Sequence, residues 1–456
     1  MSRLLIIGYV WPEPQSSAAG SRIMQLLSCF HDQGWAITFA SASARSPQAA
    51  DLSPWANAVD VKLNCSSFDT FVAELQPDVV IFDRFVSEEQ FGWRVARHCP
   101  QAVRVLDTED LHSLRWARQM LLKQQQKASN NKTQPLAVGP VTAGADQLYS
   151  MMAPSDQAQR EIAAIYRSDL SLMISPFEYQ LLHETFRVPK ALLQLTPFMP
   201  DPTAAAGLAF SEREGFITIG NFRHPPNWDA VLWLKHYLWP LVRERLPGAQ
   251  LRIYGAYQPA KATALHNPKQ GFHLCGWAPD AHEVMTRARV CLAPLRFGAG
   301  LKGKLLDALL CDTPSVTTHI GAEGMSGALP WAGAVENNPQ KWAEAAVHLY
   351  THEPSWQEAR ERGRAILAQQ FNSAEIGDAL MARVQALRSG LTEHRRDNFI
   401  GAMLNHHAHK STQYMSQWIE AKNAGRSEVD RSEVDRSEVD RSEVDRSEAG
   451  RNKKDV

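Results

Sequence analysis

The sequence predicts an α/β protein with two Rossmann-like, doubly wound domains facing each other across a cleft, followed by a disordered C-terminal tail. Short runs rich in Val, Ile, Leu and Phe alternate with amphipathic segments as far as about Leu387. Uninterrupted apolar strands separated by helices are typical of a parallel sheet covered on both faces. The alternation starts again near Phe216, and 456 residues suit two or three domains.

The first series of strands comprises LLIIGYV, AITFAS, DVVIFD and AVRVLD. The helix expected after the first strand is SRIMQLLSCFHDQG, with Ser17 or Ser21 as its N-cap and Gly34 as its stop. The second series comprises GFITIGNF, AQLRIYGAY, GFHLCGW, VCLAPLR and PSVTTHI, with helices such as NWDAVLWLKHYLWPLVRER between them. Two such series predict two doubly wound domains.

Irregular segments divide the chain. TPFMPDPTAAAG clusters prolines and small residues, so we place the seam there: residues 1–195 form the first domain, 196–390 the second with its closing helices, and 391–456 a helical extension and tail. KQQQKASNNKTQPLAVGPVTAGAD is expected to be a mobile loop inserted in the first domain. The RSEVD repeats from Arg426 carry no aromatic residue or apolar stripe, so they predict a solvated, disordered tail.

Charge and cysteine content exclude several classes of protein. The 48 Lys and Arg residues nearly balance the 49 Asp and Glu residues, which argues against a nucleic-acid partner. The six cysteines form no CxxC pair, so neither a disulfide framework nor a structural zinc site is expected. No run approaches the roughly 20 apolar residues that cross a bilayer. We therefore expect a cytoplasmic protein, with peripheral contact at the inner face of the membrane left open.

The segment from Val290 to Met325 carries the most chemical information. A strand ends near Pro294, a turn with three glycines follows, and a helix is expected from about Leu301. The glycines are Gly298, Gly300 and Gly303. Glycines allow close approach of the backbone to a ligand, and the free amides at a helix start attract anions. With Lys302 and Lys304 at the same point, the segment predicts a diphosphate site, and Asp307 could accept hydrogen bonds from a ribose.

Beyond this pattern, the chain resembles the GT-B fold glycosyltransferases of the retaining family 4 (glycosyl transferases group 1) type. In the second domain the resemblance is carried by GFITIGNFRHPPNWDAV, LPGAQLRIYGAY, GFHLCGWAPDAHEVMTRARVCLAPLRFGAG and LKGKLLDALLCDTPSVTTHIGAEG. In the first domain it is looser, through GYVWPEPQSSAAGSRIMQLL and VLDTEDLHSLR. It covers most of the chain up to about Leu387.

The resemblance implies a nucleotide-sugar donor held mainly by the second domain and an acceptor held by the first. It places the GAGLKGK loop against the diphosphate and Asp307 at the ribose. The donor-binding residues that it implies are Gly220, Asn221, Arg223, Gly298, Gly300, Lys302, Lys304, Asp307 and Glu323. Arg223 could equally stabilise a turn, and Glu323 could belong to a plain surface turn.

One position departs from the family pattern. Many members carry a Glu-x7-Glu pair, but eight residues before Asp307 this chain has Ala299, and its second acid is Asp rather than Glu. The departure puts the usual orientation of the sugar in doubt, and it leaves the nucleotide site in place.

In the first domain, VLDTEDLHSLR follows a strand and is expected to direct Asp107, Asp110, His112 and Arg115 toward the cleft. We expect His112 to form a hydrogen bond with the donor sugar and Asp110 to position the sugar or the acceptor; the alternative for His112 is a solvated or structurally satisfied ring. With Lys304, these two are the candidate catalytic residues.

Gly20, Ser21 and Arg22 are expected on the acceptor side together with Arg115, although an ordinary helix N-cap would also explain the first three. Ser175 and Glu178 match a capping box and are assigned to structure.

The sequence therefore predicts a retaining glycosyltransferase that moves a sugar from a nucleotide sugar to a saccharide or lipid-linked acceptor, in the synthesis of surface polysaccharides or glycoconjugates. No cofactor and no metal ion are expected. Two alternatives remain open: another enzyme on the same fold, such as a nucleotide-sugar epimerase, and a non-catalytic nucleotide-binding subunit.

Overall fold

The computed structural model describes residues 1–128, 138–201, 207–406 and 410–424. Its first sheet has seven parallel strands in the order β3-β2-β1-β4-β5-β6-β7. These strands are β1 (Arg3–Gly8), β2 (Ala36–Ser41), β3 (Asn57–Asp60), β4 (Val79–Asp83), β5 (Val103–Asp107), β6 (Leu170–Met173) and β7 (Leu193–Leu195).

The second sheet has six parallel strands in the order β10-β9-β8-β11-β12-β13. They are β8 (Phe216–Ile219), β9 (Leu251–Tyr254), β10 (Phe272–Gly276), β11 (Val290–Ala293), β12 (Ser315–Thr317) and β13 (Gly333–Val335). In both sheets the strand order reverses beside the first strand, and such a switch point opens a crevice at the carboxyl ends of the strands.

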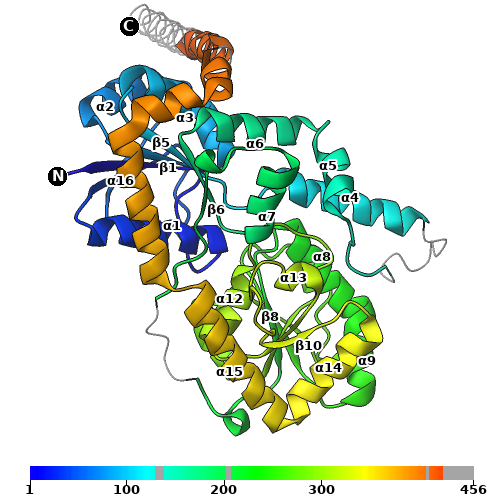
Figure 1. Ribbon diagram of the computed structural model, residues 1–456. Helices are drawn as coiled ribbons and strands as arrows, with labels where there is room; N and C mark the ends of the chain where they lie inside the picture. Colours follow the sequence, from blue (N-terminus) through cyan, green and yellow to red (C-terminus); the bar gives the residue numbers. More distant parts are fainter. Residues whose placement is uncertain (129–137, 202–206, 407–409, 425–456) are drawn as a thin grey trace, which may run out of the picture.

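Helices cover both faces of each sheet (Figure 1). Those between the strands of the first sheet are α1 (Ala18–Asp32), α2 (Ser67–Leu75), α3 (Arg84–His98), α4 (His112–Ala128), α5 (Ala145–Met152), α6 (Asp156–Arg167) and α7 (Pro176–Gln180). Those of the second are α8 (Pro225–Trp233), α9 (Trp239–Arg245), α10 (Ala260–Thr263), α11 (Ala281–Arg287), α12 (Gly303–Leu310), α13 (His319–Ala322), α14 (Pro339–Thr351) and α15 (Glu353–Gln370). Residues 399–406 and 410–424 are also helical.

The last long helix, α16 (Ser373–Asp397), returns the chain to the first sheet (Figure 1). Leu380, Val384 and Leu387 on α16 are buried in the same apolar cluster as the strands of that sheet. The preceding helix, α15, packs on α12 in the second domain. Consecutive helices therefore belong to opposite halves of the molecule, and the chain crosses between the halves at residues 371–372.

The two predicted sheets are confirmed, and the main differences are four short strands, of which β3, β7 and β13 lie at sheet edges and β6 lies inside the first sheet. The strands β3, β6, β7 and β13 were not expected from the sequence; they have three or four residues each. The predicted loop beginning KQQQK was wrong at its start, because α4 continues through Ala128. The middle of that loop, part of the proposed seam and the RSEVD tail lie outside the described residues, and the three-part division of the chain stays a proposal. In the described part of the chain, no helix combines the length and the apolar character that a membrane crossing requires.

Candidate functional site

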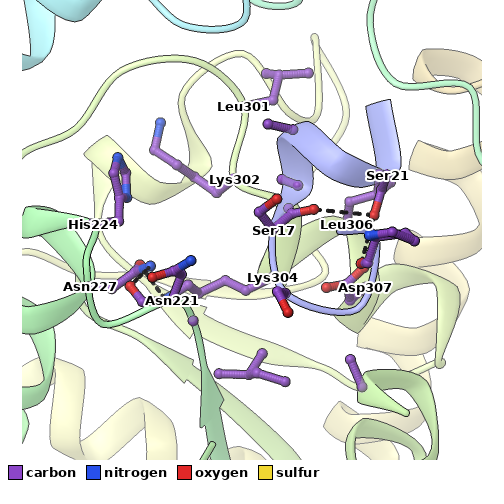
Figure 2. Close-up of a pocket in the computed structure, with 18 of the residues that line it drawn as sticks. Ser17, Ser21, Asn221, His224, Asn227, Leu301, Lys302, Lys304, Leu306 and Asp307 are labelled. Carbon is purple, nitrogen blue, oxygen red and sulfur yellow. Dashed lines mark hydrogen bonds between the residues drawn. The ribbon is translucent and has the colours of Figure 1, made fainter. Parts of the chain in front are cut away.

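A cavity of about 880 Å³ lies where the carboxyl ends of the strands of both sheets meet. Its walls come from the loop before α1, the loop after β5, the loop after β8, the start of α11 and the glycine-rich loop that leads into α12. Figure 2 shows side chains from the start of α1, from the loop after β8 and from the glycine-rich loop and α12 gathered around one space. The cavity is therefore the place where groups from both domains can act on one ligand.

The glycine-rich loop after β11 forms one wall. Gly298, Lys302 and Lys304 line the cavity, and α12 begins at Gly303. Leu305 and Leu306 donate their amides to the carbonyl of Lys302. The backbone amides of Gly303 and Lys304 are the first two of α12. The amides at the start of a helix carry partial positive charge, so this end of α12 favours an anion.

The side chain of Lys304 extends toward Asn221 and Asn227 (Figure 2). Its Nζ donates a 2.8 Å hydrogen bond to Oδ1 of Asn227. Burial lowers the pKa of the lysine to about 8, an effect that Cys291 and Asp307 partly oppose. An anion that entered beside this amine would stabilise its charged form.

Asp307 follows one turn later on α12 and also lines the cavity. His282, at the start of α11, lies 3.4 Å from its Oδ1, and this hydrogen bond is the main cause of a raised pKa for the histidine. Asp280 caps α11 by accepting the amides of His282 and Glu283. Together, the starts of α11 and α12 present a carboxylate and an imidazole beside the lysine.

Asp110, His112 and Arg115 form the opposite wall. Arg115 forms an ion pair with Asp110, and Nε2 of His112 lies 3.6 Å from Oδ1 of the same carboxylate. Although burial opposes ionisation, Arg115 and the nearby histidines hold the pKa of Asp110 far below its usual range. Burial lowers the pKa of His112 to about 4, so its ring is neutral at pH 7.

His224, which sequence reasoning passed over, stands between the two walls. It lines the cavity, and burial together with Arg115 lowers its pKa to about 3. Arg223, the basic residue predicted there, also lines the cavity but is exposed, and its guanidinium lies 3.7 Å from the ring centre of Tyr257. The histidine could have been found from the sequence, because it is the next residue of the same loop.

Gly220 and Asn221 line the cavity beside Asn227, as Figure 2 shows for the two asparagines. The side-chain amide of Asn227 donates to the carbonyl of Asn221 at 3.0 Å. A Cβ on Gly220 would lie 2.7 Å from the Asn227 side chain, so only glycine leaves this contact in place.

The loop before α1 closes a third side. Ser17 caps α1 by accepting the amide of Gly20, and Ser21 donates to the carbonyl of Pro14. Both serines line the cavity, whereas Gly20 does not. Gly20 has no side chain, and the backbone of Glu13 packs closely against it. A Cβ on residue 20 would lie 2.4 Å from the Glu13 backbone.

Arg22 does not reach the cavity, contrary to the expectation for the acceptor side. It is fully buried, donates to the carbonyl of Pro197 at 2.7 Å and pairs with Asp107. Asp107 is fully buried in this ion pair and does not line the cavity either. The physical reason is mutual neutralisation, because a buried charge needs a partner.

Three predicted donor-binding residues support the glycine-rich loop instead of facing the cavity freely. Glu323 pairs with Arg118, which also donates to the carbonyl of Gly298 at 2.8 Å. Lys302 donates its Nζ to the carbonyls of Ala299 and Gly300 in its own loop. Gly300 and Glu323 are absent from the lining, and Lys302 contributes to it while its amine is engaged.

Two further residues of the first domain line the cavity, Arg84 after β4 and Glu109 after β5. Both have left-handed backbones, with φ of 68° and 58°. Such strain in non-glycine residues concentrates at functional sites. Burial and the carboxylates of Asp107 and Asp83 raise the pKa of Glu109, and its Oε1 has no hydrogen-bond partner among the described residues. The rule that ligands bind at strand ends would have pointed to both.

Within the described ranges, no cluster of three or more His, Cys, Asp or Glu side chains is arranged to hold a metal ion. Independence from metal ions stays a prediction.

Comparison with known proteins finds a family match for part of the chain. Residues 213–352 match the model of the family described as glycosyl transferases group 1. No curated protein sequence matches the chain. The fold is similar to that of sucrose-phosphate synthase from Thermosynechococcus elongatus, with 15% identity, a TM-score of 0.59, and 86% of this chain and 100% of that chain covered.

Two further solved structures share the fold. A glycosyltransferase from Rickettsia africae has 9% identity and a TM-score of 0.57 over 85% of this chain and 98% of its own. The Anabaena protein HepE, solved in complex with UDP, has 10% identity and a TM-score of 0.54 over 85% of this chain and 100% of its own.

Proposed function

We propose that this glycosyltransferase, whose GT-B fold carries a glycosyl transferases group 1 domain, transfers a sugar from a nucleotide sugar to a saccharide or lipid-linked acceptor with retention of configuration. The observation that carries the proposal is the pairing of two walls across one cavity. Lys304 and the start of α12 form one wall, and Asp110, His112 and Arg115 form the other.

The donor's diphosphate is proposed to lie against the amides of Gly303 and Lys304. The helix start and the lysine charge stabilise the negative charge that develops on the leaving phosphate. Asp307 and His282 are proposed to bind the ribose hydroxyls, because the carboxylate accepts hydrogen bonds and the imidazole lies against it. The similarly folded HepE was solved in complex with UDP, which supports a nucleotide sugar as the class of donor.

The sugar is proposed to extend from the diphosphate toward His224, Asp110 and His112. With its pKa near 4, His112 is a neutral hydrogen-bonding group rather than a cation. Asp110 holds Arg115 and His112 in place through its carboxylate. Retention is attributed to attack from the face of the leaving group, with the departing phosphate accepting the proton of the acceptor.

The acceptor is proposed to enter along the first domain, beside Ser21, Arg84 and Glu109. The unpaired oxygen of Glu109 and the guanidinium of Arg84 offer an acceptor and a donor of hydrogen bonds. Such a combination suits the hydroxyl groups of a saccharide.

Peripheral contact with the inner face of the membrane is a further part of the proposal. Six large apolar side chains are exposed on the C-terminal helices: Phe399, Ile400, Met403, Tyr414, Met415 and Trp418. Lys422 lies 4.9 Å from the ring centre of Trp418. Aromatic residues beside lysines favour the interface of a bilayer. Co-sedimentation with phosphatidylglycerol vesicles tests this part: binding should be lost in Trp418→Ala, and equal binding of variant and wild type would contradict it.

Titration with UDP, GDP, ADP and CDP sugars, followed by an assay with and without saccharide acceptors, tests the main proposal. At least one donor should bind and should be consumed only with an acceptor. Lys304→Ala should weaken that binding by about tenfold to hundredfold, the usual effect of one charged hydrogen bond. Conversion of the donor without acceptor would indicate an epimerase, and binding without turnover across acceptors would indicate a non-catalytic subunit.

A further inference from the structure

Glu178 on α7 bridges the two domains beneath the cavity. Its Oε1 accepts the amide of Gly300 in the second domain at 2.7 Å and the amide of Leu111 in the first domain at 3.2 Å. The side chain is fully buried. The capping box expected from the sequence is only half present: Ser175 accepts the amide of Glu178, but the carboxylate is directed away from the helix start.

The two amides belong to the segments that build opposite walls of the cavity. Gly300 lies between Gly298 and Lys302 in the glycine-rich loop, and Leu111 lies between Asp110 and His112. These segments touch, because a Cβ on Gly300 would lie 2.8 Å from Cβ of Asp110. One oxygen atom thus fixes the distance between the glycine-rich loop, which leads to Lys304, and the turn that carries Asp110 and His112.

The other oxygen, Oε2, is buried and has no hydrogen-bond partner among the described residues. Burial, helped by the charge of Asp110, raises the pKa of Glu178 to about 8, against the opposing effects of the two amides and Lys302. At pH 7 the neutral acid therefore predominates. A neutral carboxyl keeps one oxygen as acceptor for both amides without placing a second bare charge beside Asp110.

We propose that Glu178 is a positioning residue of the transfer reaction, which holds the glycine-rich loop against the Asp110–His112 turn when the two domains close. The inference rests on the function proposed above. Glu178 does not line the cavity, so it acts through the loops that it bonds and does not touch the reactants. The glycine-rich loop has no acidic residue of its own that could hold it against this turn, since the residue before Gly300 is Ala299.

The test compares three variants of the full chain: Glu178→Ala, Glu178→Gln and the control Gln180→Ala, which alters an exposed residue of the same helix. Hydrogen–deuterium exchange is measured for peptides covering residues 108–114 and 297–304, with and without UDP. Glu178→Ala should speed exchange in both peptides by about tenfold, as expected for loss of a buried hydrogen bond. Glu178→Gln retains the carbonyl acceptor and should exchange like the wild type, as should Gln180→Ala.

Kinetics supply the second measurement. Glu178→Ala should lower kcat by about tenfold or more while the Kd for UDP changes by less than about threefold, because it leaves the phosphate-binding groups in place. Glu178→Gln should restore most of kcat. Unchanged exchange and kcat in the Ala variant, or an equal loss in the Gln variant, would overturn the proposal. If Glu178→Ala fails to fold, the Gln variant decides alone: wild-type exchange supports the role and fast exchange refutes it.

The exchange measurement also separates this inference from the proposed function. If no nucleotide sugar is turned over but exchange in the two peptides still depends on residue 178, the function fails while the bridge stands. If transfer is observed and exchange does not depend on residue 178, the bridge fails alone.

Discussion

Lys304 makes donor affinity depend on pH. Its pKa of about 8 should rise when a diphosphate binds beside it, so binding above pH 8 takes up a proton. The affinity for UDP should therefore fall as the pH rises from 7.5 to 9.5. Calorimetric titrations across this range check the sign. Lys304→Gln should bind more weakly and should lose the part of the pH dependence that comes from this residue; an identical slope in both proteins would rule out Lys304 as its source.

Asp110 organises the opposite wall through its ion pair with Arg115 and its contact with His112. Asp110→Asn keeps the shape of the side chain but removes the charge that holds Arg115. We expect kcat to fall by about tenfold to hundredfold, within the range of a lost polar catalytic contact, while the affinity for UDP stays nearly unchanged. Asp156→Asn, at an exposed position, serves as the control. An equal loss of UDP affinity would place Asp110 at the nucleotide instead.

Sequence reasoning at this scale located several residues of the cavity wall, among them Lys304, Asp307, Asp110 and His112, because they stand in recognisable turns and helix starts. It could not tell which charged residues pair with each other. Arg22 pairs with Asp107, which is 85 positions away, and Glu323 pairs with Arg118, which is 205 positions away. These paired side chains do not line the cavity. Pairings at such separations depend on the folded arrangement and leave no local signal in the sequence.

At the scale of elements, the start of α12 and the start of α1 meet at a glycine. A Cβ on Gly303 would lie 2.6 Å from Cβ of Ala18, closer than side chains approach. Gly303→Ala should therefore push α1 away from the glycine-rich loop and lower kcat. Because both residues line the cavity and are only partly buried, the far-ultraviolet circular dichroism should stay unchanged.

Gly248→Ala is the matched control, since a Cβ there meets nothing within 4 Å. Assays of kcat and thermal unfolding of both variants check the prediction. Wild-type kcat in Gly303→Ala would show that the contact between α1 and α12 is not needed for activity.

The central strands could be predicted because they are buried on both faces, and their apolar runs have no other explanation. The strands β3 and β13 lie at sheet edges, and β3 (NAVD) has no apolar run to detect. Their pairing comes from the neighbouring strand in the sheet. The course of α16 onto the first sheet depends on contacts between residues far apart in the sequence, such as that of Arg388 with Asp78 at 310 positions.

For the whole molecule, Tyr257 connects the two domains at the rim of the cleft. Its hydroxyl lies 2.9 and 2.8 Å from the two carboxylate oxygens of Glu13 on the other domain. Nearby, Trp277 donates its indole N–H to the carbonyl of Gln15 at 3.2 Å. These contacts join the loop before α1 to the second domain, so they hold the cavity closed.

Tyr257→Phe should shift the unliganded protein toward a more open form. Small-angle scattering should show a larger radius of gyration, and saturating UDP should restore the compact value, because a ligand held by both domains favours the closed form. Tyr149→Phe, which alters a tyrosine outside the cavity lining, is the control. A radius of gyration equal to that of the wild type would mean that the rim contact does not hold the domains.

A crystal structure of the protein bound to UDP would test the proposed donor site most directly. We expect the β-phosphate within hydrogen-bonding distance of the Gly303 and Lys304 amides and the Lys304 amine, with the ribose beside Asp307. A diphosphate seated elsewhere in the cleft, away from the start of α12, would contradict it.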